Sequence, residues 1–229
     1  DDDNILVIRT LLAKIKRLGI DNVILEASSH GLHQGRLNGI NFKTAIFTNF
    51  SQDHLDYHKN MKNYLNAKLI LFSKLLKKKH SIITDNEIPE FTKFKKIRKI
   101  NNLNLLTIGK KRSTIQFKSV KPDDNLQNIV FRYKKKNYKV KIPLIGFFQI
   151  KNLFMSILAA KLSGLSFKKI LHALKNIKEV NGRIQLIKTT PNQTKIFLDY
   201  AHTPDALETV LKTLKEHYKI RPDIVFGCG

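Results

Sequence analysis

Hydrophobic positions in the first half of the chain follow two different spacings. Over residues 5–18, apolar side chains recur every three or four positions, which is typical of one face of a helix, and Gly19 offers a place for it to end. The same spacing predicts a helix over residues 60–76. Shorter apolar runs predict buried strands, and they cover residues 22–25, 44–48 and 80–84.

Helices that alternate with buried strands predict an α/β fold with a doubly wound, mostly parallel sheet. In such sheets, ligands bind where the carboxyl ends of the strands meet. Glu26 directly follows the first predicted strand, and Asn49 follows the second. We therefore expect both side chains at the ligand-binding edge of the sheet.

The second half of the chain is more polar, above all over residues 97–142. Its short apolar runs alternate with polar residues, most regularly over 138–142, which indicates antiparallel strands with one solvated face. The other elements predicted in this half are helices over 152–162, 166–176 (with Ser166 as its N-cap) and 204–218, and strands over 114–117, 129–133, 184–187, 196–198 and 224–226.

The chain carries far more cations than anions, with 42 Lys and Arg against 18 Asp and Glu in 229 residues and a formal net charge of +24. Such an excess is typical of proteins that bind nucleic acid or anionic membranes. The lysines are nevertheless scattered, and runs such as Lys77–Lys79 and Lys134–Lys136 lie beside predicted turns. No base-stacking or groove-reading motif accompanies them, so we expect no nucleic-acid partner and interpret the charge as a solvated surface that also attracts anionic nucleotides.

The cysteine content and the apolar stretches indicate the cellular compartment of the protein. Cys228 is the only cysteine in the sequence, so no internal disulfide can form, which is typical of a reducing compartment. The acidic start, DDDN, differs from the basic start of a secretory signal. The longest apolar stretch, 144–165, is interrupted by Lys151, Asn152 and Lys161, and is too polar to span a membrane. These features predict a cytoplasmic protein without a membrane partner, which we expect to be a monomer.

Two segments concentrate side chains that can carry chemistry. The first, Thr48 to His58, reads TNFSQDHLDYH and directly follows a predicted strand. Its spacing of histidines and aspartates fits a metal site of several kinds, and it equally fits a solvated turn that caps a helix. The second, Glu26 to Arg36, reads EASSHGLHQGR, and a serine near a histidine is also found in hydrolases. No Gly-x-Ser-x-Gly turn surrounds these serines, which argues against a nucleophilic serine.

Together these segments resemble the central domain of the Mur ligases, and the pattern SSHGL-x-QGR is similar to that of the MurE type. Later segments agree with the family in order and spacing, which makes chance an inadequate explanation. The resemblance covers nearly the whole chain and is weakest over 85–142. The further segments that carry it are NAKLILF (66–72), GFFQIKN (146–152), NGR (181–183), DYAHTPDAL (199–207) and FGCG (226–229).

The resemblance implies an ATP-dependent ligase of peptidoglycan biosynthesis. In this family, ATP phosphorylates the glutamate carboxylate of UDP-N-acetylmuramoyl-L-alanyl-D-glutamate, and the amine of a diamino acid, meso-diaminopimelate or L-lysine, attacks the acyl phosphate. Such a transfer needs Mg2+ to neutralise the phosphates and a site that holds carboxylate and phosphate in line. We therefore expect Mg2+ as the cofactor, and ATP, the UDP-linked dipeptide and the diamino acid as substrates.

The resemblance also implies a catalytic and metal-binding group. Glu26 resembles a Mg2+ ligand, since carboxylate oxygens suit this hard cation, and His54 resembles a ligand of a second Mg2+. Lys68 would ordinarily be a surface lysine on a helix. The family lysine at this place is carbamylated, however, which converts a cation into an anionic oxygen donor.

Three residues of the loop after Glu26 resemble substrate contacts of the family. Ser28, Gln34 and Arg36 are expected to contact the UDP-linked dipeptide. Arg36 can bind a phosphate or a carboxylate through two parallel hydrogen bonds.

The ATP contacts that the resemblance implies are Asn152, Arg183, Asp199 and His202, with Arg183 facing the phosphates and Asp199 the ribose. Simpler alternatives remain open for two of them, because Asn152 could cap a helix and Asp199 could belong to a turn at a strand end. The chain departs from the family at Gln149, where an asparagine is usual. The longer side chain predicts a reshaped loop on the adenine side.

A larger departure is the lack of a GxxGKT/S phosphate loop, since residues 109–113 lack the upstream glycine. In the family this loop lies just before the first helix, and the motif that reads the diamino acid lies beyond Gly229. We therefore expect a fragment that is inactive alone, because no loop holds the β- and γ-phosphates. Its expected parts are residues 1–181 from the central, ATP-binding domain and residues 182–229 from the C-terminal domain, without the N-terminal domain.

Two rival functions are consistent with parts of the sequence. Another ligase of the same superfamily, such as a folylpolyglutamate synthetase or a cyanophycin-synthetase-like enzyme, would share the architecture, but the loop SSHGLHQGR argues against it. A basic nucleic-acid-binding protein is the other rival. It predicts tight binding that weakens steeply with salt.

Overall fold

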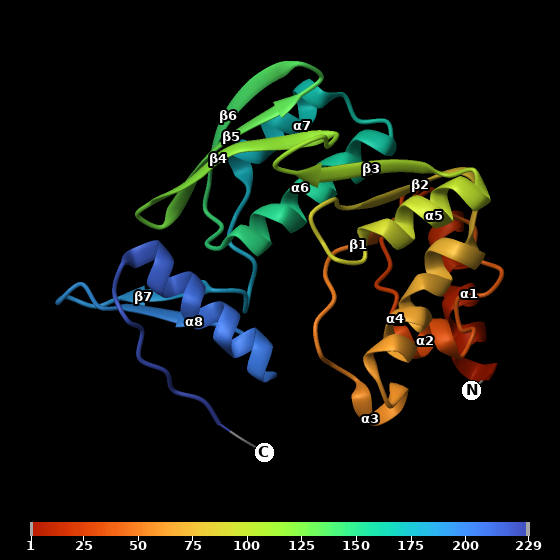
Figure 1. Cartoon of the computed structure of the whole chain (residues 1–229), viewed down its shortest axis with the longest axis horizontal. Coiled ribbons are helices and arrows are strands. Elements are labelled where there is room, and N and C mark those ends of the chain that lie inside the picture. The colour runs from red at the N-terminus through yellow and green to blue at the C-terminus, as the bar shows by residue number, and fades with distance from the viewer. Residues whose placement is uncertain (1, 228–229) are drawn as a thin grey trace. The chain divides into compact units, whose positions relative to one another are not determined.

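The computed structural model describes residues 2–227, and the side chains of residues 6–227. The chain divides into two compact units, whose elements are labelled in Figure 1. Unit 1 runs up to Thr84 and resumes at Ile88–Leu106. Unit 2 comprises Asp85–Glu87 and the chain from Thr107 onward. Each unit has its own helices and its own buried aromatic core.

Unit 1 contains the elements predicted in the first half of the chain, with one exception described below. The helices expected over 5–18 and 60–76 are confirmed, the second with a π-helical turn at its end. The elements are α1 (Asp2–Arg17), α2 (Ser29–His33), β1 (Phe42–Phe47), α3 (Leu55–His58), α4 (Met61–Ile70), the π-helical turn η1 (Leu71–Leu75), β2 (Leu76–Asp85), α5 (Phe91–Asn101) and β3 (Asn104–Gly109). The last residue of β2 and the last three residues of β3 belong to unit 2.

Six strands are hydrogen-bonded in the order β1-β2-β3-β4-β5-β6. The strand β1 runs parallel to β2, and β3 runs parallel to β4. The mixed α/β fold class is therefore confirmed, although β3 lies in the segment predicted to be antiparallel and pairs in parallel. The last three strands, β4 (Ile115–Asp123), β5 (Leu126–Tyr133) and β6 (Lys136–Ile142), form the predicted antiparallel hairpins.

Three phenylalanines lie at the centre of the core of unit 1. Phe47 of β1, Phe72 of η1 and Phe94 of α5 are almost fully buried. The Phe94 ring centroid lies 4.8 Å from that of Phe47 and 5.0 Å from that of Phe72, in the tilted and edge-on arrangements that aromatic pairs prefer. This cluster holds together β1 and the α4–η1 segment, the elements that lead into the candidate site.

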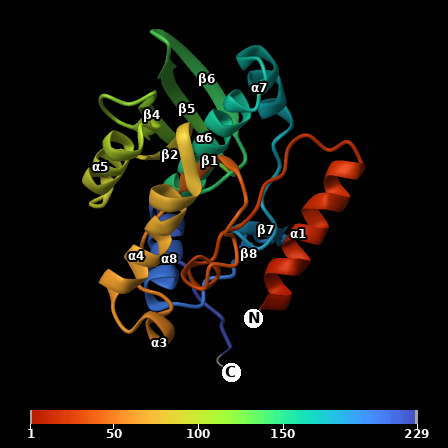
Figure 2. The same cartoon turned by 90° about the vertical axis from the view of Figure 1, so that its right-hand side faces the viewer.

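The segment 22–25 is not a strand, so this prediction was wrong. Residues 21–28 form neither helix nor strand, and Val23, Ile24 and Leu25 are exposed, with Ile24 at 99% of its full accessibility. A strand needs a hydrogen-bonded neighbour, and among the described residues β1 has only β2 as its neighbour. The apolar run is instead an extended connection from α1 to α2. Figure 2 shows α1 standing apart from α3 and α4 of the same unit.

In unit 2, the antiparallel strands β4 to β6 pack on the helix α6 (Phe147–Leu162). The ring centroids of Phe117 and Phe131 lie 5.0 and 4.7 Å from that of Phe154 in α6. One face of these strands is therefore buried, as the alternating pattern predicts. The helix begins at Phe147 rather than at residue 152, because its N-cap is Gly146.

The remaining elements of unit 2 confirm the two helices 166–176 and 204–218 and two of the three strands. Residues 221–227 form neither helix nor strand, and Val225 and Phe226 are exposed, so the strand predicted over 224–226 is wrong. As with 22–25, no described strand pairs with it. The confirmed elements are α7 (Phe167–Ala173) with the 3-10 turn η2 (Leu174–Asn176), β7 (Gln185–Thr189), β8 (Lys195–Leu198) and α8 (Pro204–Tyr218).

Ser166 caps α7, as predicted, and its Oγ accepts a hydrogen bond from the backbone N–H of Lys169 at 3.3 Å. The substitution Ser166→Ala removes this bond and is expected to lower the free energy of unfolding by about 1 kcal/mol. Urea denaturation followed by circular dichroism measures the loss. Ser156→Ala, on the exposed side of α6, is the control and should change stability by less than about 0.5 kcal/mol. Equal losses in the two variants would contradict the capping role.

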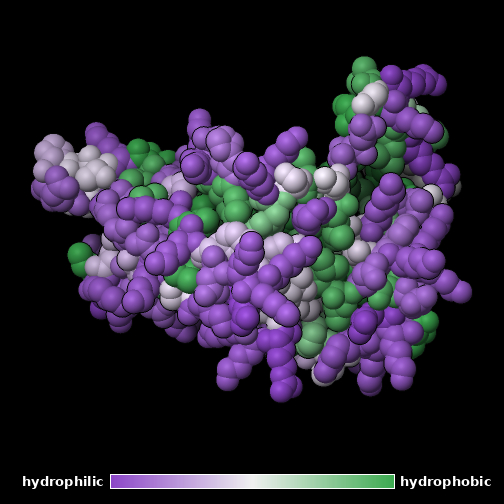
Figure 3. Space-filling model, turned by 90° about the horizontal axis from the view of Figure 1, so that it is seen from above, coloured by the Kyte–Doolittle hydropathy of each residue, from purple (hydrophilic) through white to green (hydrophobic). Residues whose placement is uncertain are grey.

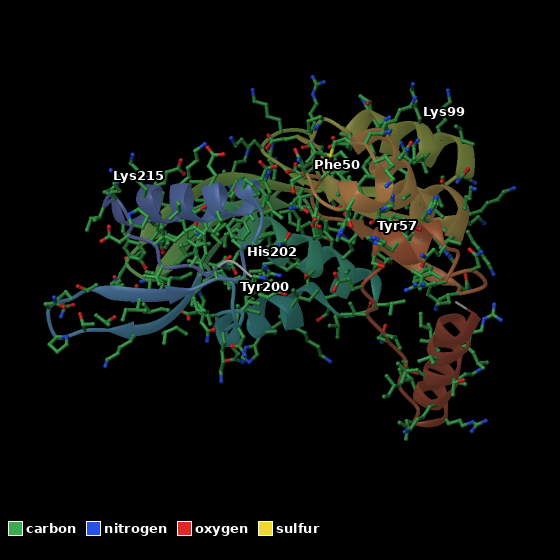
Figure 4. The ribbon with its side chains drawn as sticks, turned by 90° about the horizontal axis from the view of Figure 1, so that it is seen from below. Phe50, Tyr57, Lys99, Tyr200, His202 and Lys215 are labelled. Atoms are coloured by element: carbon green, nitrogen blue, oxygen red, sulfur yellow. The ribbon has the colours of Figure 1, made fainter. Side chains whose placement is uncertain are left out.

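The surface of the protein is rich in charged side chains. Hydrophilic groups project over most of the face seen in Figure 3, with smaller hydrophobic areas between them. Lys99 of α5 and Lys215 of α8 extend away from their helices (Figure 4). Within residues 2–227, no helix combines the length and the apolar character that crossing a membrane requires.

Candidate functional site

The loop that follows Glu26 folds into the short helix α2, which is capped by its own serine. Ser28 Oγ accepts a hydrogen bond from the backbone N–H of Gly31 at 3.1 Å, the usual N-cap arrangement. A Cβ at Gly31 would lie 3.1 Å from that oxygen, so glycine permits the tight cap. Glu26 itself is exposed and lies in the segment without regular structure, so it does not follow a strand as the sequence suggests.

Gln34 and Arg36 lie at the other end of α2. The backbone N–H of Gln34 donates to the carbonyl of His30, and its side chain is exposed. Arg36 is half-buried, and its backbone N–H donates to the carbonyl of Gly31 at 2.8 Å. The structure therefore brings Ser28, Gln34 and Arg36 together in one compact turn, which is called the serine–arginine turn below.

Asp53 and His54 lie just before α3. His54 has φ 53°, a left-handed conformation that residues other than glycine seldom adopt. Asp53 stabilises it, because its Oδ1 accepts a hydrogen bond from the His54 backbone N–H at 2.8 Å and its Oδ2 lies 3.5 Å from His54 Nε2. Strained backbone of this kind is frequent at ligand-binding sites. Sequence reasoning misses Asp53 as a site residue, although its place beside His54 is a signal that could have found it.

Lys68 is half-buried in the last turn of α4, just before the π-helical turn. Its Nζ lies 4.9 Å from the ring centroid of Tyr64, one helical turn earlier. Burial lowers the pKa of Lys68, while the carboxylates of Asp53 and Glu26 act in the opposite direction. A lowered pKa favours the neutral amine, which is the form that reacts with carbon dioxide. The carboxylates that act on it show that Lys68, Glu26 and Asp53 share one electrostatic environment.

These side chains suit a hard divalent cation only if Lys68 is modified. Within the described part of the chain, no three His, Cys, Asp or Glu side chains form a group that could hold a metal ion. Glu26 and His54 therefore do not complete a site by themselves, and the ammonium of Lys68 has no lone pair to offer. A carbamate on Lys68 would add oxygen donors of the kind that Mg2+ prefers. With that carbamate, Glu26 and Lys68 would both offer oxygen donors to Mg2+.

The two segments with chemical side chains, 26–36 and 48–58, meet through a cluster of rings. The His30 ring centroid lies 4.9 Å from that of His54 and 4.1 Å from that of Tyr57, which is labelled in Figure 4. His33 Nδ1 lies 2.9 Å from the hydroxyl of Tyr57. Contacts of this kind join parts of the chain that are 24 or more residues apart. The histidine–tyrosine cluster consists of His30, His33, His54, Tyr57, His58 and Tyr64.

Tyr64 is buried and should titrate above a free tyrosine. Burial, assisted by the charge of Asp53, raises the pKa of Tyr64 to about 12, against ~10 for a free tyrosine. The folded pKa of Tyr64 lies above the unfolded one. Burial of the neutral tyrosine therefore stabilises the fold fully below pH ~10, and this stabilisation is lost as pH rises through the folded pKa. The tyrosinate absorbance of the wild type minus that of Tyr64→Phe should therefore show a step near pH 12. A step near pH ~10 would contradict the burial effect.

In unit 2, two of the residues expected to contact ATP, Arg183 and His202, both lie beside Tyr200. The Arg183 guanidinium lies over the Tyr200 ring, with Cζ 5.6 Å from its centroid. Tyr200 and His202 lie side by side in Figure 4, with ring centroids 5.2 Å apart. Arg183 and His202 are both exposed, so an anionic ligand can reach them.

Asp199 uses both carboxylate oxygens to shape the backbone next to Arg183. Its Oδ2 accepts a hydrogen bond from the Ile184 N–H and its Oδ1 one from the Ala201 N–H, both at 2.8 Å. Ile184 is buried with φ 46°, a costly conformation for a β-branched residue. The observed contacts are those of a turn residue, the simpler alternative, and a carboxylate retains lone pairs for a further donor.

Asn152 and Gln149 both lie within α6, where one is exposed and the other is buried. Asn152 lies exposed inside α6, so the alternative in which it caps that helix is wrong. Gln149 is buried, and its Nε2 donates to the carbonyls of Ile145 and Arg183 at 2.8 and 3.0 Å. The bond to Arg183 connects the start of α6 to the segment that carries this expected ATP contact, and the bond to Ile145 stays at the start of the helix.

Comparison with known families places the chain in one class. Residues 3–160, more than half of the chain, match the Mur ligase middle domain. Residues 182–229 match the Mur ligase, glutamate ligase domain. The chain belongs to the Mur ligase family, as its motifs suggest.

Similar curated proteins point to one member of that family. The chain is 39% identical over 224 residues to the UDP-N-acetylmuramoyl-L-alanyl-D-glutamate–2,6-diaminopimelate ligase of Rickettsia montanensis. It is 40% identical over 226 residues to the ligase of the same name from Rickettsia bellii (strain RML369-C). Both alignments cover 96% of this chain and 46% of the relative, so the chain spans about half the length of these relatives.

Solved structures show the same likeness. A structure of a UDP-N-acetylmuramoyl-L-alanyl-D-glutamate–2,6-diaminopimelate ligase superposes with a TM-score of 0.70 at 32% identity, and covers 84% of this chain and 39% of that one. The MurF ligase from Thermotoga maritima in complex with ADP superposes with a TM-score of 0.67 at 18% identity, over 82% of this chain and 42% of that one. The second likeness shows the shared fold alone.

Proposed function

We propose that this chain is part of an ATP-dependent ligase that adds a diamino acid to UDP-N-acetylmuramoyl-L-alanyl-D-glutamate in peptidoglycan biosynthesis. The observation that carries the proposal is Lys68, half-buried in the electrostatic range of Glu26 and Asp53. A lysine whose burial favours the neutral amine suits the formation of a carbamate, which provides oxygen donors for Mg2+. The names of the similar proteins support 2,6-diaminopimelate as the diamino acid.

In the proposed enzyme, Glu26, His54 and carbamylated Lys68 hold Mg2+. The cation, when bound, supplies the positive charge that neutralises the phosphates of ATP. Asp53 keeps the His54 backbone in its left-handed conformation, and Tyr64 packs against the end of Lys68. These contacts orient the donor groups before the substrates bind, which reduces the entropy lost in reaching the reactive arrangement.

The serine–arginine turn is the proposed binding site of the UDP-linked dipeptide. Its Ser28 hydroxyl and Gln34 side chain are exposed and can form hydrogen bonds with a sugar or peptide. Arg36 is half-buried, so water screens its charge less than that of an exposed arginine. Its guanidinium suits a carboxylate or a phosphate of this substrate.

The proposed ATP contacts are Arg183, Asn152, Asp199 and His202 in unit 2. Arg183 is the best placed for phosphate oxygens, since it is exposed and the Tyr200 ring supports its guanidinium. We place the central domain at residues 1–181 and the C-terminal domain at 182–229, where the glutamate ligase match begins. A cytoplasmic location is part of the proposal, because ATP and reduced cysteine are found there.

The test is a ligation assay on the complete reading frame that contains this chain. The purified protein receives ATP, Mg2+, UDP-N-acetylmuramoyl-L-alanyl-D-glutamate and either meso-diaminopimelate or L-lysine, and both phosphate release and product mass are measured. We expect phosphate release that depends on the diamino acid, and a UDP-linked tripeptide as product. Turnover with a folate and glutamate instead would support the rival ligase. DNA binding that is tight at low salt and falls steeply with salt would support the nucleic-acid-binding rival.

A further inference from the structure

A buried hydrogen bond joins α2 to α3, and no step of the proposed reaction uses either of its ends. His58 Nε2 lies 2.9 Å from Ser29 Oγ. Ser29 is 3% exposed and His58 is 4% exposed, so water cannot replace either partner. Leaving a buried polar group without its partner is unfavourable, which makes this bond a firm constraint on the two helices.

On one side, the bond holds the serine–arginine turn. Ser29 is the first residue of α2 and directly follows Ser28, the N-cap. A shift of Ser29 therefore moves Ser28 and the rest of the short helix with it, including Gln34 at its C-terminal end. The position of the proposed substrate contacts thus depends on what holds Ser29.

On the other side, the bond leads to the proposed metal-binding residues. His58 is the last residue of α3, and its backbone N–H donates to the carbonyl of His54 at 3.0 Å. Its ring stacks on Tyr64, with centroids 5.2 Å apart and planes inclined by 26°. The Tyr64 ring in turn contacts Lys68 Nζ. His58 therefore lies in direct contact with the surroundings of both His54 and Lys68.

We propose that Ser29 and His58 are positioning residues, which set the distance between the serine–arginine turn and the metal-binding residues His54 and Lys68. This inference rests on the proposed function. Neither side chain touches a reacting atom in it, since Ser29 acts through Ser28, and His58 acts through His54 and Tyr64. Small displacements of bound groups strongly reduce the rate of a transfer that needs carboxylate and phosphate in line, by roughly 100-fold for about 1 Å.

The test uses the complete ligase with four variants and a matched control. Ser29→Ala and His58→Asn remove the bond from either end, and the double variant combines them. His58→Gln keeps an amide group near the place of Nε2 and so can still bond Ser29. Ser81→Ala, a buried serine of β2 outside both helices, is the control.

Ser29→Ala and His58→Asn are each expected to lower kcat/KM for the UDP-linked dipeptide by about 10- to 100-fold, with little change in KM for ATP. Because both remove the same bond, the double variant should be no worse than the poorer single variant. His58→Gln should recover most of the activity, and Ser81→Ala should match the wild type. The recovery separates positioning from a general loss of folding.

Four results would overturn the inference. Wild-type kcat/KM in Ser29→Ala and His58→Asn, or effects that multiply in the double variant, would show that the bond does not position the site. An equal loss in Ser81→Ala would show a general loss of stability. An unchanged 15N shift of His58 Nε2 in Ser29→Ala, recorded on the 229-residue chain, would show that the bond itself is absent. An inactive wild-type ligase would instead overturn the proposed function, and the positioning role with it.

Discussion

Replacing Lys68 with arginine is expected to reduce the turnover of the complete ligase by about 1000-fold, or roughly 4 kcal/mol in activation free energy. Arginine keeps the positive charge and a similar reach, but its guanidinium stays protonated and cannot capture carbon dioxide. The fixed cation would also remain near Glu26 and Asp53, where it would compete with a divalent metal ion. Steady-state ADP release in the presence of all three substrates measures the loss.

Lys62→Arg is the matched control, because Lys62 lies exposed on the same helix. Its turnover should equal that of the wild type. Nuclear magnetic resonance with 13C-bicarbonate gives a second readout, since a carbamate carbon should appear in the wild type and in Lys62→Arg but not in Lys68→Arg. Full turnover of Lys68→Arg would show that Lys68 is an ordinary helix lysine and that the site needs no carbamate.

Phe94→Ala is expected to lower the free energy of unfolding by about 3–5 kcal/mol, because it removes a large buried ring and leaves a cavity. Phe94 is fully buried and contacts the rings of both Phe47 and Phe72. A loss of this size is a large part of the 5–15 kcal/mol by which domains are usually stable. Urea denaturation followed by circular dichroism measures it.

Ile100→Ala, on the same helix, is the control for this loss. Ile100 is 80% exposed, so its truncation removes little buried surface and should change stability by less than about 0.5 kcal/mol. Equal losses in Phe94→Ala and Ile100→Ala would show that burial in the core is not the cause, since alanine favours a helix more than either residue does. That result would contradict the placement of Phe94 at the centre of unit 1.

Local spacing along the chain was enough to predict the elements whose partners lie close in sequence. The hairpins β4–β5–β6 follow from alternating residues, and α8 follows from its apolar spacing together with a proline in its first turn. Ser166 is another such case, since a helix cap depends on residues three positions apart. The helix α5 was not predicted, because five of its eleven residues are Lys or Arg and Phe94 is its one fully buried side chain.

Strand formation shows where local spacing is insufficient. The runs 22–25 and 224–226 are as apolar as β1, yet both lie exposed outside any sheet among the described residues. A strand is stabilised by hydrogen bonds to a neighbour that the run itself does not encode. Whether such a run forms a strand is therefore decided by the tertiary structure.

The candidate site was likewise predicted from the sequence only in part. The sequence by itself determined the family, because its segments 26–36, 48–58 and 66–72 resemble the Mur ligases and residues 3–160 match their middle domain. It also singled out Glu26, His54 and Lys68 as candidates. Only the tertiary structure showed that Asp53 acts on Lys68 and that Ser29 bonds His58. The physical reason is that a motif records which side chains are present. Burial and contacts between residues 29 positions apart arise only once the chain has folded.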